Sequence, residues 1–220
     1  MLYPGFISGS YESQSPLADL ERTVNWYPEP IEPQSVPWNA ALYPCPGFEE
    51  YVTLSNVNTR ALFSMAGRVY GVIGDSVYKF TSSNSASIVT NGTVTNDPNP
   101  AQIASNGDAG GELLIGSGDN GYLLTISSNA LSTISALAGK CTMVGIIDGY
   151  FLSFDASDSK FYISALNDGS TWDATQYAQR SIAPDPWKAM VVDGSRQIWL
   201  IGEQTGEVWY DAGTSPFPFA

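Results

Sequence analysis

The sequence contains no histidine and only two cysteines among its 220 residues. Without histidine the chain lacks the commonest general base and the commonest metal ligand, which excludes Ser-His-Asp and Cys-His catalytic arrangements and histidine-based zinc sites. Cys45 lies among prolines and Cys141 lies in an apolar segment, so we expect each to be an unpaired thiol. No apolar run is long enough to span a membrane, and we expect no secretory signal at the N-terminus.

Basic residues are also scarce. The nine Lys and Arg are outnumbered by 22 Asp and Glu, which gives a formal net charge of −13. The acidic residues are spread along the chain rather than gathered in a tail. Because affinity for nucleic acid comes from cations that contact phosphate, we do not expect the chain to grip DNA. An acidic surface would instead repel DNA and other anionic partners.

Short apolar runs separated by Gly, Pro, Ser, Thr and Asn predict an all-β protein. Four stretches share one pattern, an apolar strand, a polar turn and a second strand rich in aromatic residues; they are residues 68–80, 112–126, 150–164 and 197–211. Their anchor residues Tyr78, Tyr122, Tyr162 and Trp209 are 44, 40 and 47 residues apart. A further small-apolar strand precedes each hairpin, and residues 86–94 and 130–135 are candidate fourth strands.

A period of this length with about four strands is typical of a β-propeller blade. We therefore predict a propeller of about four blades over residues 58–220, either part of a larger propeller or closed by the N-terminal segment. Residues 1–57 hold most of the fourteen prolines and are predicted to form an extended arm that docks on something else.

Two patterns suggest chemistry but have simpler explanations. The "GSGDNG" of residues 116–121 matches a dinucleotide-binding loop, yet a strand follows it where that fold needs a helix, so a hairpin turn is favoured. The carboxylates of Asp155, Asp158, Asp168 and Asp173 could form a catalytic pair or a calcium loop, but the spacing lacks a closing Glu and favours turn formation. We expect no catalytic residue, no metal site and no cofactor.

The stretch "ALNDGSTWDATQYA" (residues 165–178) is close to the Asp-box turn of sialidases and other propellers. Ala165 and Asn167 depart from that pattern. We expect an inter-blade corner in which Asn167, Asp168 and Gly169 make the turn and Trp172 packs beneath it. The other tryptophans of the repeats, such as Trp187, Trp199 and Trp209, are expected to fill the gaps between blades.

Two stretches make the chain resemble the packaged-DNA stabilisation proteins, or tail hub and tail accessory factors, of short-tailed bacteriophages. The first is residues 9–30, in which Gly9, Tyr11 and Arg22 precede "NWYPEP". The second is residues 161–213, with "NDGSTWDA", "PDP" and "GEQTGEVWYDAG". The residues that match the family's motifs, with structural roles, are Asn25, Tyr27, Pro28, Glu29, Asn167, Asp168, Gly169, Trp172, Asp185, Pro186, Gly202, Glu207, Trp209 and Tyr210.

The resemblance implies a non-enzymatic virion protein of the phage tail, assembled in the host cytoplasm as a homo-oligomeric ring, by analogy a hexamer. The ring would lie below the portal and its adaptor, stabilise packaged DNA in its lumen without sequence-specific binding, and dock tail fibres or spikes. Family members are usually longer, so these blades would be incomplete relative to the family. The alternatives are a carbohydrate-binding or glycan-depolymerising propeller, suggested by the Asp-box-like turn and the aromatic residues, and a generic bacterial propeller scaffold.

Overall fold

The computed structural model describes residues 24–30, 40–54, 58–65, 67–82, 85–89, 92–180 and 184–220. The chain divides into two compact units, Met1–Glu50 and Tyr51–Ala220. In the first unit, β1 (Trp26–Pro30) pairs antiparallel with β2 (Ala40–Pro44). Prolines within both strands suit a two-stranded ribbon with open edges, because proline cannot donate to a sheet ladder.

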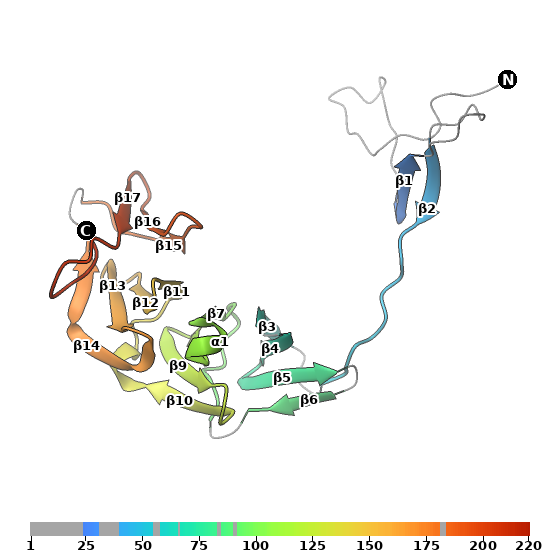
Figure 1. Cartoon of the computed structure of the whole chain (residues 1–220), viewed down its shortest axis with the longest axis horizontal. Helices are drawn as coiled ribbons and strands as arrows, with labels where there is room; N and C mark the ends of the chain where they lie inside the picture. Colours follow the sequence, from blue (N-terminus) through green and yellow to red (C-terminus); the bar gives the residue numbers. More distant parts are fainter. Residues whose placement is uncertain are drawn as a thin grey trace. The chain divides into compact units, whose positions relative to one another are not determined.

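The second unit consists of four antiparallel sheets that follow one another along an arc (Figure 1). The first blade comprises β3 (Thr59–Met65), β4 (Arg68–Ile73), β5 (Ser76–Ser82) and β6 (Ser85–Ile88). The second comprises β7 (Gln102–Ser105), β8 (Glu112–Ser117), β9 (Asn120–Thr125) and β10 (Ala130–Ile134). The third comprises β11 (Met143–Ile147), β12 (Tyr150–Asp155), β13 (Lys160–Ala165) and β14 (Asp168–Gln179). The fourth comprises β15 (Ala189–Val192), β16 (Gln197–Ile201) and β17 (Gly206–Tyr210).

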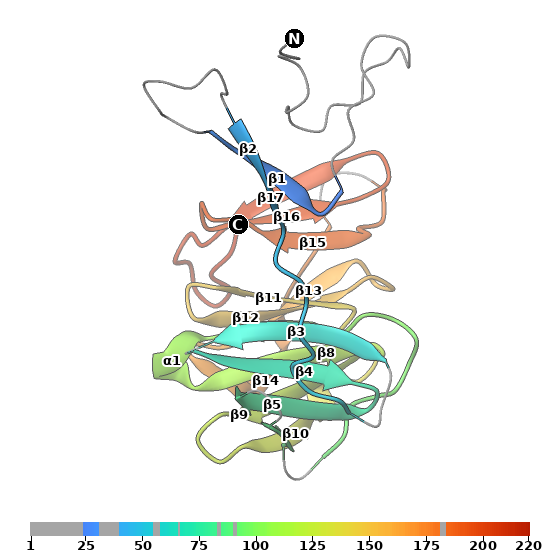
Figure 2. The ribbon, with the colours of Figure 1, turned by 90° about the vertical axis from the view of Figure 1, so that its right-hand side faces the viewer.

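Strands pair in chain order within every blade, and the first strands of adjoining blades contact one another, β3 with β7, β7 with β11 and β11 with β15. The first strand of each blade is therefore the inner one, as in a propeller. In Figure 2 the sheet formed by β3, β4 and β5 faces the viewer, with the other blades behind it. The all-β propeller fold is confirmed, and the described residues form the four blades predicted from the repeats. Helix is confined to the single turn α1 (Gly107–Gly110) and the 3-10 turn Ser135–Leu137 within the described ranges.

The hydrophobic core lies between the blades. Alternate residues of each strand point to opposite faces of its sheet, so each blade contributes apolar side chains to the layers on both sides. Between the third and fourth blades the buried residues include Leu152, Phe154, Phe161, Trp187 and Leu200. Between the first two they include Tyr70, Val72, Leu113, Ile115 and Leu124, and between the second and third Leu114, Leu123, Leu137 and Phe151. The free energy of folding thus depends on blade-to-blade packing.

The hairpin turns use Asn, Asp and Gly at left-handed backbone positions. Gly118 and Asp119, with φ of 56° and 58°, join β8 to β9. Two consecutive positive φ values define the turn type whose twist matches that of a hairpin. The "GSGDNG" stretch is therefore a strand–turn–strand unit, as predicted, and it does not open a helix that could hold a pyrophosphate.

Residues 165–178 form a different structure from the predicted inter-blade corner, and that prediction was wrong. Asn167, with φ of 55°, makes the β13–β14 turn, but the following residues form a fourth strand of twelve residues. β14 pairs with β13 at both ends, Ala165 opposite Asp168 and Lys160 opposite Gln179, with register shifts between them. The strand tolerates Asp173 because residues in the shifted segment are exposed to solvent.

Both cysteines are free thiols, as predicted: Cys45 is exposed and Cys141 is buried. Burial raises the pKa of the Cys141 thiol to about 12. Because the thiolate is the reactive form, we expect Cys141 to react poorly in the folded protein. None of the helices in the described residues is long and apolar enough to cross a membrane.

Candidate functional site

The "NDGSTW" motif connects the third blade to the second by a hydrogen bond and by packing. Gly169 donates its N–H to a carboxylate oxygen of Glu112 over 2.9 Å, and Glu112 belongs to β8 of the second blade. The carbonyl of Gly169 accepts the indole N–H of Trp172 over 2.7 Å, so the half-buried ring folds back over the turn. Trp172 also packs against the core between the second and third blades. The tryptophan therefore packs under the turn, as expected.

Glycine is required at position 169 by the space available. A Cβ there would lie 2.6 Å from Leu123 Cδ1 and 2.9 Å from Phe151 Cε2, which is closer than packed carbon atoms allow. Asp168 accepts hydrogen bonds from the hydroxyl and the N–H of Ser170, and the hydroxyl bond is the larger cause that lowers the pKa of its carboxyl. Both motif residues thus act on the shape of the turn.

Asp185 of the "PDP" motif organises the loop between β16 and β17. Its carboxylate accepts the backbone N–H groups of Glu203, Gln204 and Thr205 over 3.1, 2.8 and 2.7 Å, and the Thr205 hydroxyl over 3.0 Å. These bonds, led by that from Gln204, lower the pKa of Asp185 to about 2. A Cβ at Gly202 would lie 2.3 Å from the carboxylate, so only glycine lets this loop approach Asp185.

We expect the contribution of Asp185 to stability to depend on pH. Its folded pKa of about 2 lies below the ordinary aspartate value of about 3.9, so the stabilisation is complete above about pH 4 and is lost as the pH falls toward 2. Asp185→Asn should therefore lower the melting temperature at pH 7, and its difference from the unmodified protein should shrink below about pH 4. Asp173→Asn is the control, since that carboxylate accepts bonds from Thr175 alone and should show a smaller difference. A difference for Asp185→Asn that stays constant from pH 7 to 2.5 would contradict this role.

The rest of the "GEQTGEVWYDAG" motif lies on β17. Trp209 packs edge-on against Phe161, with ring centroids 5.7 Å apart, and donates its indole N–H to buried Glu207 over 3.2 Å. Tyr210 points to the opposite side and is exposed. Pro186 lies beside Asp185 in the segment that enters the fourth blade. Gly169, Trp172 and Trp209 therefore lie at the contacts between blades. Asp185 and Gly202 instead shape a loop of the fourth blade, and Tyr210 is exposed.

One tryptophan of the fourth blade does not face the third blade. Trp199 is 43% exposed, and its indole N–H bonds the Asp193 carboxylate over 3.0 Å. β16 turns Ile198 and Leu200 toward the third blade and Trp199 away from it, so Trp199 does not fill the gap between the third and fourth blades. By contrast, Trp187 and Trp209 do fill such a gap.

The N-terminal motif residues lie in the β1–β2 ribbon. Asn25, with φ of 60°, accepts the Cys45 N–H on its carbonyl over 2.8 Å and closes the ribbon. Tyr27 stacks on Tyr43 with ring centroids 6.0 Å apart. Pro28 and Glu29 follow within β1, opposite Leu42 and Ala41. The remaining motif residues Gly9, Tyr11 and Arg22 lie outside the described residues.

The four carboxylates that could have formed a reactive cluster each bond to neighbouring groups. Asp155 accepts from Ser157, Asp158 pairs with Lys160, and the bonds of Asp168 and Asp173 are those given above. Turn formation, the simpler explanation, therefore accounts for their spacing. Among the described residues, no group of three or more Cys, Asp or Glu side chains could hold a metal ion.

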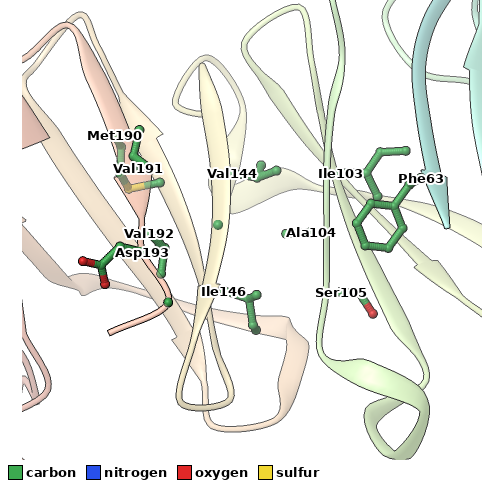
Figure 3. Close-up of a pocket in the computed structure, with 12 residues that line it drawn as sticks. Phe63, Ile103, Ala104, Ser105, Val144, Ile146, Met190, Val191, Val192 and Asp193 are labelled. Atoms are coloured by element: carbon green, nitrogen blue, oxygen red, sulfur yellow. The ribbon is translucent and has the colours of Figure 1, made fainter. Parts of the chain in front are cut away.

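The inner strands of the four blades line a groove of about 610 Å³, shown in Figure 3. Most of the described residues that line the groove are apolar, its polar side chains are those of Ser105 and Asp193, and none of these residues is lysine or arginine. The residues labelled in Figure 3 are Phe63, Ile103, Ala104, Ser105, Val144, Ile146, Met190, Val191, Val192 and Asp193. A groove of this composition has no cation with which to hold a phosphate.

Sequence reasoning missed one buried polar network. Arg60 of β3 is almost fully buried; it forms an ion pair with Asp97 and donates to the carbonyls of Asn99, Gly74 and Thr95 over 2.8, 3.1 and 2.6 Å. It fixes the connection between the first two blades onto the first. No local signal reveals such a network, because its partners are distant in the chain.

Comparisons with solved structures give weak likenesses. A chain of the S. cerevisiae Dbp5 complex with Nup159 and Gle1 is 10% identical with a TM-score of 0.47, over 80% of this chain and 46% of that one. Glutaminyl cyclase of Myxococcus xanthus is 14% identical with a TM-score of 0.42, over 73% and 68%. PorZ of Porphyromonas gingivalis is 14% identical with a TM-score of 0.40, over 68% and 20%. At these scores no functional statement follows, and no curated protein sequence matches the chain.

A family model gives a decisive match. The model of the phage-stabilisation family, described as the bacteriophage P22 Gp10 β-propeller, matches residues 7–220. The match includes the four blades, the motif residues described above and the β1–β2 ribbon. The chain therefore belongs to the phage-stabilisation family of the bacteriophage P22 Gp10 β-propeller.

Proposed function

We propose that this protein is a structural part of the phage tail or neck that forms a ring below the portal and stabilises packaged DNA. The observation that carries the proposal is the family match over nearly the whole chain, which makes the protein a phage structural β-propeller. The local hydrogen bonding of the candidate carboxylates supports a structural rather than a catalytic role.

The negative net charge of the chain supports a role in which the protein surrounds DNA without sequence-specific binding. Acidic residues exceed basic ones by thirteen, and several of the basic side chains are engaged by carboxylates of the chain itself. These pairs are Arg60–Asp97, Lys160–Asp158, Lys188–Glu203 and Arg196–Asp148. Phosphate affinity requires available cations, so a surface of this kind would let DNA slide through a lumen.

The ring is proposed to be a homo-oligomer, by analogy a hexamer, that contacts the portal or its adaptor on one side and tail fibres or spikes on the other. The packing between blades supports these contacts, because a stack of packed blades can present fixed surfaces to several neighbours at once. Assembly would take place in the host cytoplasm, with the mature protein in the virion.

Particles assembled without this protein should fill with DNA and then lose it. The measurement is the DNA content of purified particles over time, by nuclease sensitivity and by electron microscopy of full and empty heads. Supplying the protein in trans should restore full heads. Particles that lack the protein, keep their DNA and infect normally would contradict the proposal.

A further inference from the structure

The strands β13 and β14 separate over a short stretch of the third blade. Tyr162 pairs with Tyr177 and Ser164 pairs with Trp172, so Ile163 alone on β13 faces residues 173–176 of β14. The additional residues of β14 leave the ladder between the strands, as in a bulge, and bulges redirect side chains. This segment therefore carries polar side chains beside a sheet whose other positions are packed.

A pocket of about 200 Å³ lies at this separation, inside the third blade and against the segment that follows β17. Its buried apolar lining includes Ile163 and Pro218, and Tyr150, which is half-buried, also lines it. Its polar lining on β14 includes Asp173, which is exposed, and Gln176, which is half-buried. The pocket thus combines an apolar floor with polar groups nearer the solvent.

Backbone hydrogen bonds fix the far wall of the pocket. The N–H of Ala212 donates to the carbonyl of Pro218 over 2.8 Å, and Tyr210 and Ala220 exchange backbone bonds of 3.0 and 3.1 Å. Pro216 and Pro218 are thereby held against the third blade. A pocket whose walls are already in place loses little free energy to ordering when a ligand binds.

Two polar side chains of the pocket have bonding capacity to spare. Asp173 Oδ1 accepts the N–H and the hydroxyl of Thr175 over 2.8 and 2.7 Å, but Oδ2 has no hydrogen-bond partner within the described ranges. The amide of Gln176, which can both donate and accept, likewise forms no hydrogen bond to another described residue. By contrast, the hydroxyl of Ser164 is engaged, since it accepts the Phe151 N–H and donates to the Ala165 carbonyl.

The charge of the pocket excludes an anionic ligand. The hydrogen bonds from the N–H and then the hydroxyl of Thr175 lower the pKa of Asp173, so its carboxylate is ionised at neutral pH. None of the described residues that line the pocket is lysine or arginine, so a phosphate or the carboxylate of an acidic sugar would meet repulsion alone. A cation is also poorly served, because an ion pair with an exposed carboxylate contributes little free energy and the floor is apolar.

We propose that this pocket binds one ring of a neutral sugar. The C–H groups on the face of such a ring match Ile163, Tyr150 and Pro218, and the hydroxyls at its edge match Asp173 and Gln176. The volume lies below the roughly 300–1,000 Å³ of pockets for drug-sized ligands, which suits a single ring. Asp173 is the one carboxylate among the described lining residues, and glycoside hydrolysis uses two, so the site binds sugar without cleaving it. This site goes beyond the proposed function, because it requires neither the ring nor DNA.

Saturation-transfer NMR on the full-length chain tests the site, with the methyl glycosides of glucose, galactose and mannose as neutral probes. We expect at least one of them to bind with a dissociation constant on the order of 1 mM. Glucuronic acid should bind roughly tenfold more weakly than the best neutral probe, because its carboxylate faces that of Asp173. No transfer to any neutral glycoside at up to about 10 mM would overturn the proposal. Equal or tighter binding of glucuronic acid or of Nα-acetyl-lysine would overturn it too.

Variants locate the binding within the chain. Asp173→Ala and Gln176→Ala should each weaken binding of the best probe, the first by about tenfold because it removes a charged acceptor. Asp108→Ala and Gln179→Ala are the matched controls, since they remove an exposed carboxylate and an exposed amide that do not line the pocket, and they should leave binding unchanged. An unchanged melting temperature shows that a variant is folded, and Gln176→Ala keeps the test if Asp173→Ala does not fold. Binding that is the same in all folded variants would place the sugar elsewhere and reject this site.

Discussion

Replacing Trp187 with alanine is expected to lower the free energy of unfolding by about 3–5 kcal/mol, the range for deleting a large buried aromatic side chain. Trp187 is 1% exposed and lies between the third and fourth blades, with ring centroids 6.3 Å from Phe161 and 6.5 Å from Trp209. Its removal leaves a cavity lined by aromatic rings that belong to two different sheets. Rigid sheets close such a cavity poorly, which favours the upper part of the range.

Urea unfolding of the purified protein measures this effect. If the slope of the unfolding free energy against urea concentration is the same as in the unmodified protein, the unfolded state is not altered. Trp187→Phe keeps part of the ring contacts, so its free energy of unfolding should fall less than that of Trp187→Ala. Leu166→Ala is the surface control and should change the free energy by no more than about 0.5 kcal/mol. A loss below about 1 kcal/mol for Trp187→Ala would mean that this core does not join the blades.

Replacing Arg60 with methionine is expected to lower the free energy of unfolding by about 2–4 kcal/mol. Breaking a buried ion pair costs about 3–5 kcal/mol when the remaining charge is fully buried, but the Asp97 side chain keeps 21% exposure, so water offsets part of the loss. Three backbone carbonyls also lose their guanidinium donors. We therefore expect the change to loosen the connection that joins the first two blades.

A double-mutant cycle separates the charge from the packing. Adding Asp97→Asn to Arg60→Met removes the unpaired carboxylate and should recover part of the lost free energy of unfolding. Arg60→Lys retains the charge but not the forked geometry, so it should fall between the unmodified protein and Arg60→Met. Asp97→Asn alone completes the cycle, and a loss in the double variant equal to the sum of the two single losses would show that Asp97 is not coupled to Arg60.

The sequence predicted the features that depend on neighbouring residues. The three inner strands of every blade follow from hairpin patterns, in which an apolar run, an Asn, Asp or Gly turn and a second run are contiguous. β14 was missed because its pairing with β13 is interrupted by register shifts and its residues 173–176 carry no alternating apolar pattern.

Features that depend on distant residues were not predictable. Asp185 bonds a loop about twenty residues away, and Arg60 pairs with Asp97 across a separation of 37 residues. The motif residues could be recognised from the family, but only the fold shows which of them lie between blades. The exposure of Trp199 likewise depends on which side of β16 meets the third blade, and an alternating strand pattern does not specify that side.

The pairing of strands in chain order has a consequence for how the protein is made. Because each sheet joins only neighbouring segments of the chain, its contacts span few residues, and folds rich in such local contacts form quickly. The strands of a blade can therefore pair as soon as they have left the ribosome, and each blade gives the next one a surface on which to pack. We therefore expect apolar strands to be unpaired only briefly during synthesis, which would limit aggregation.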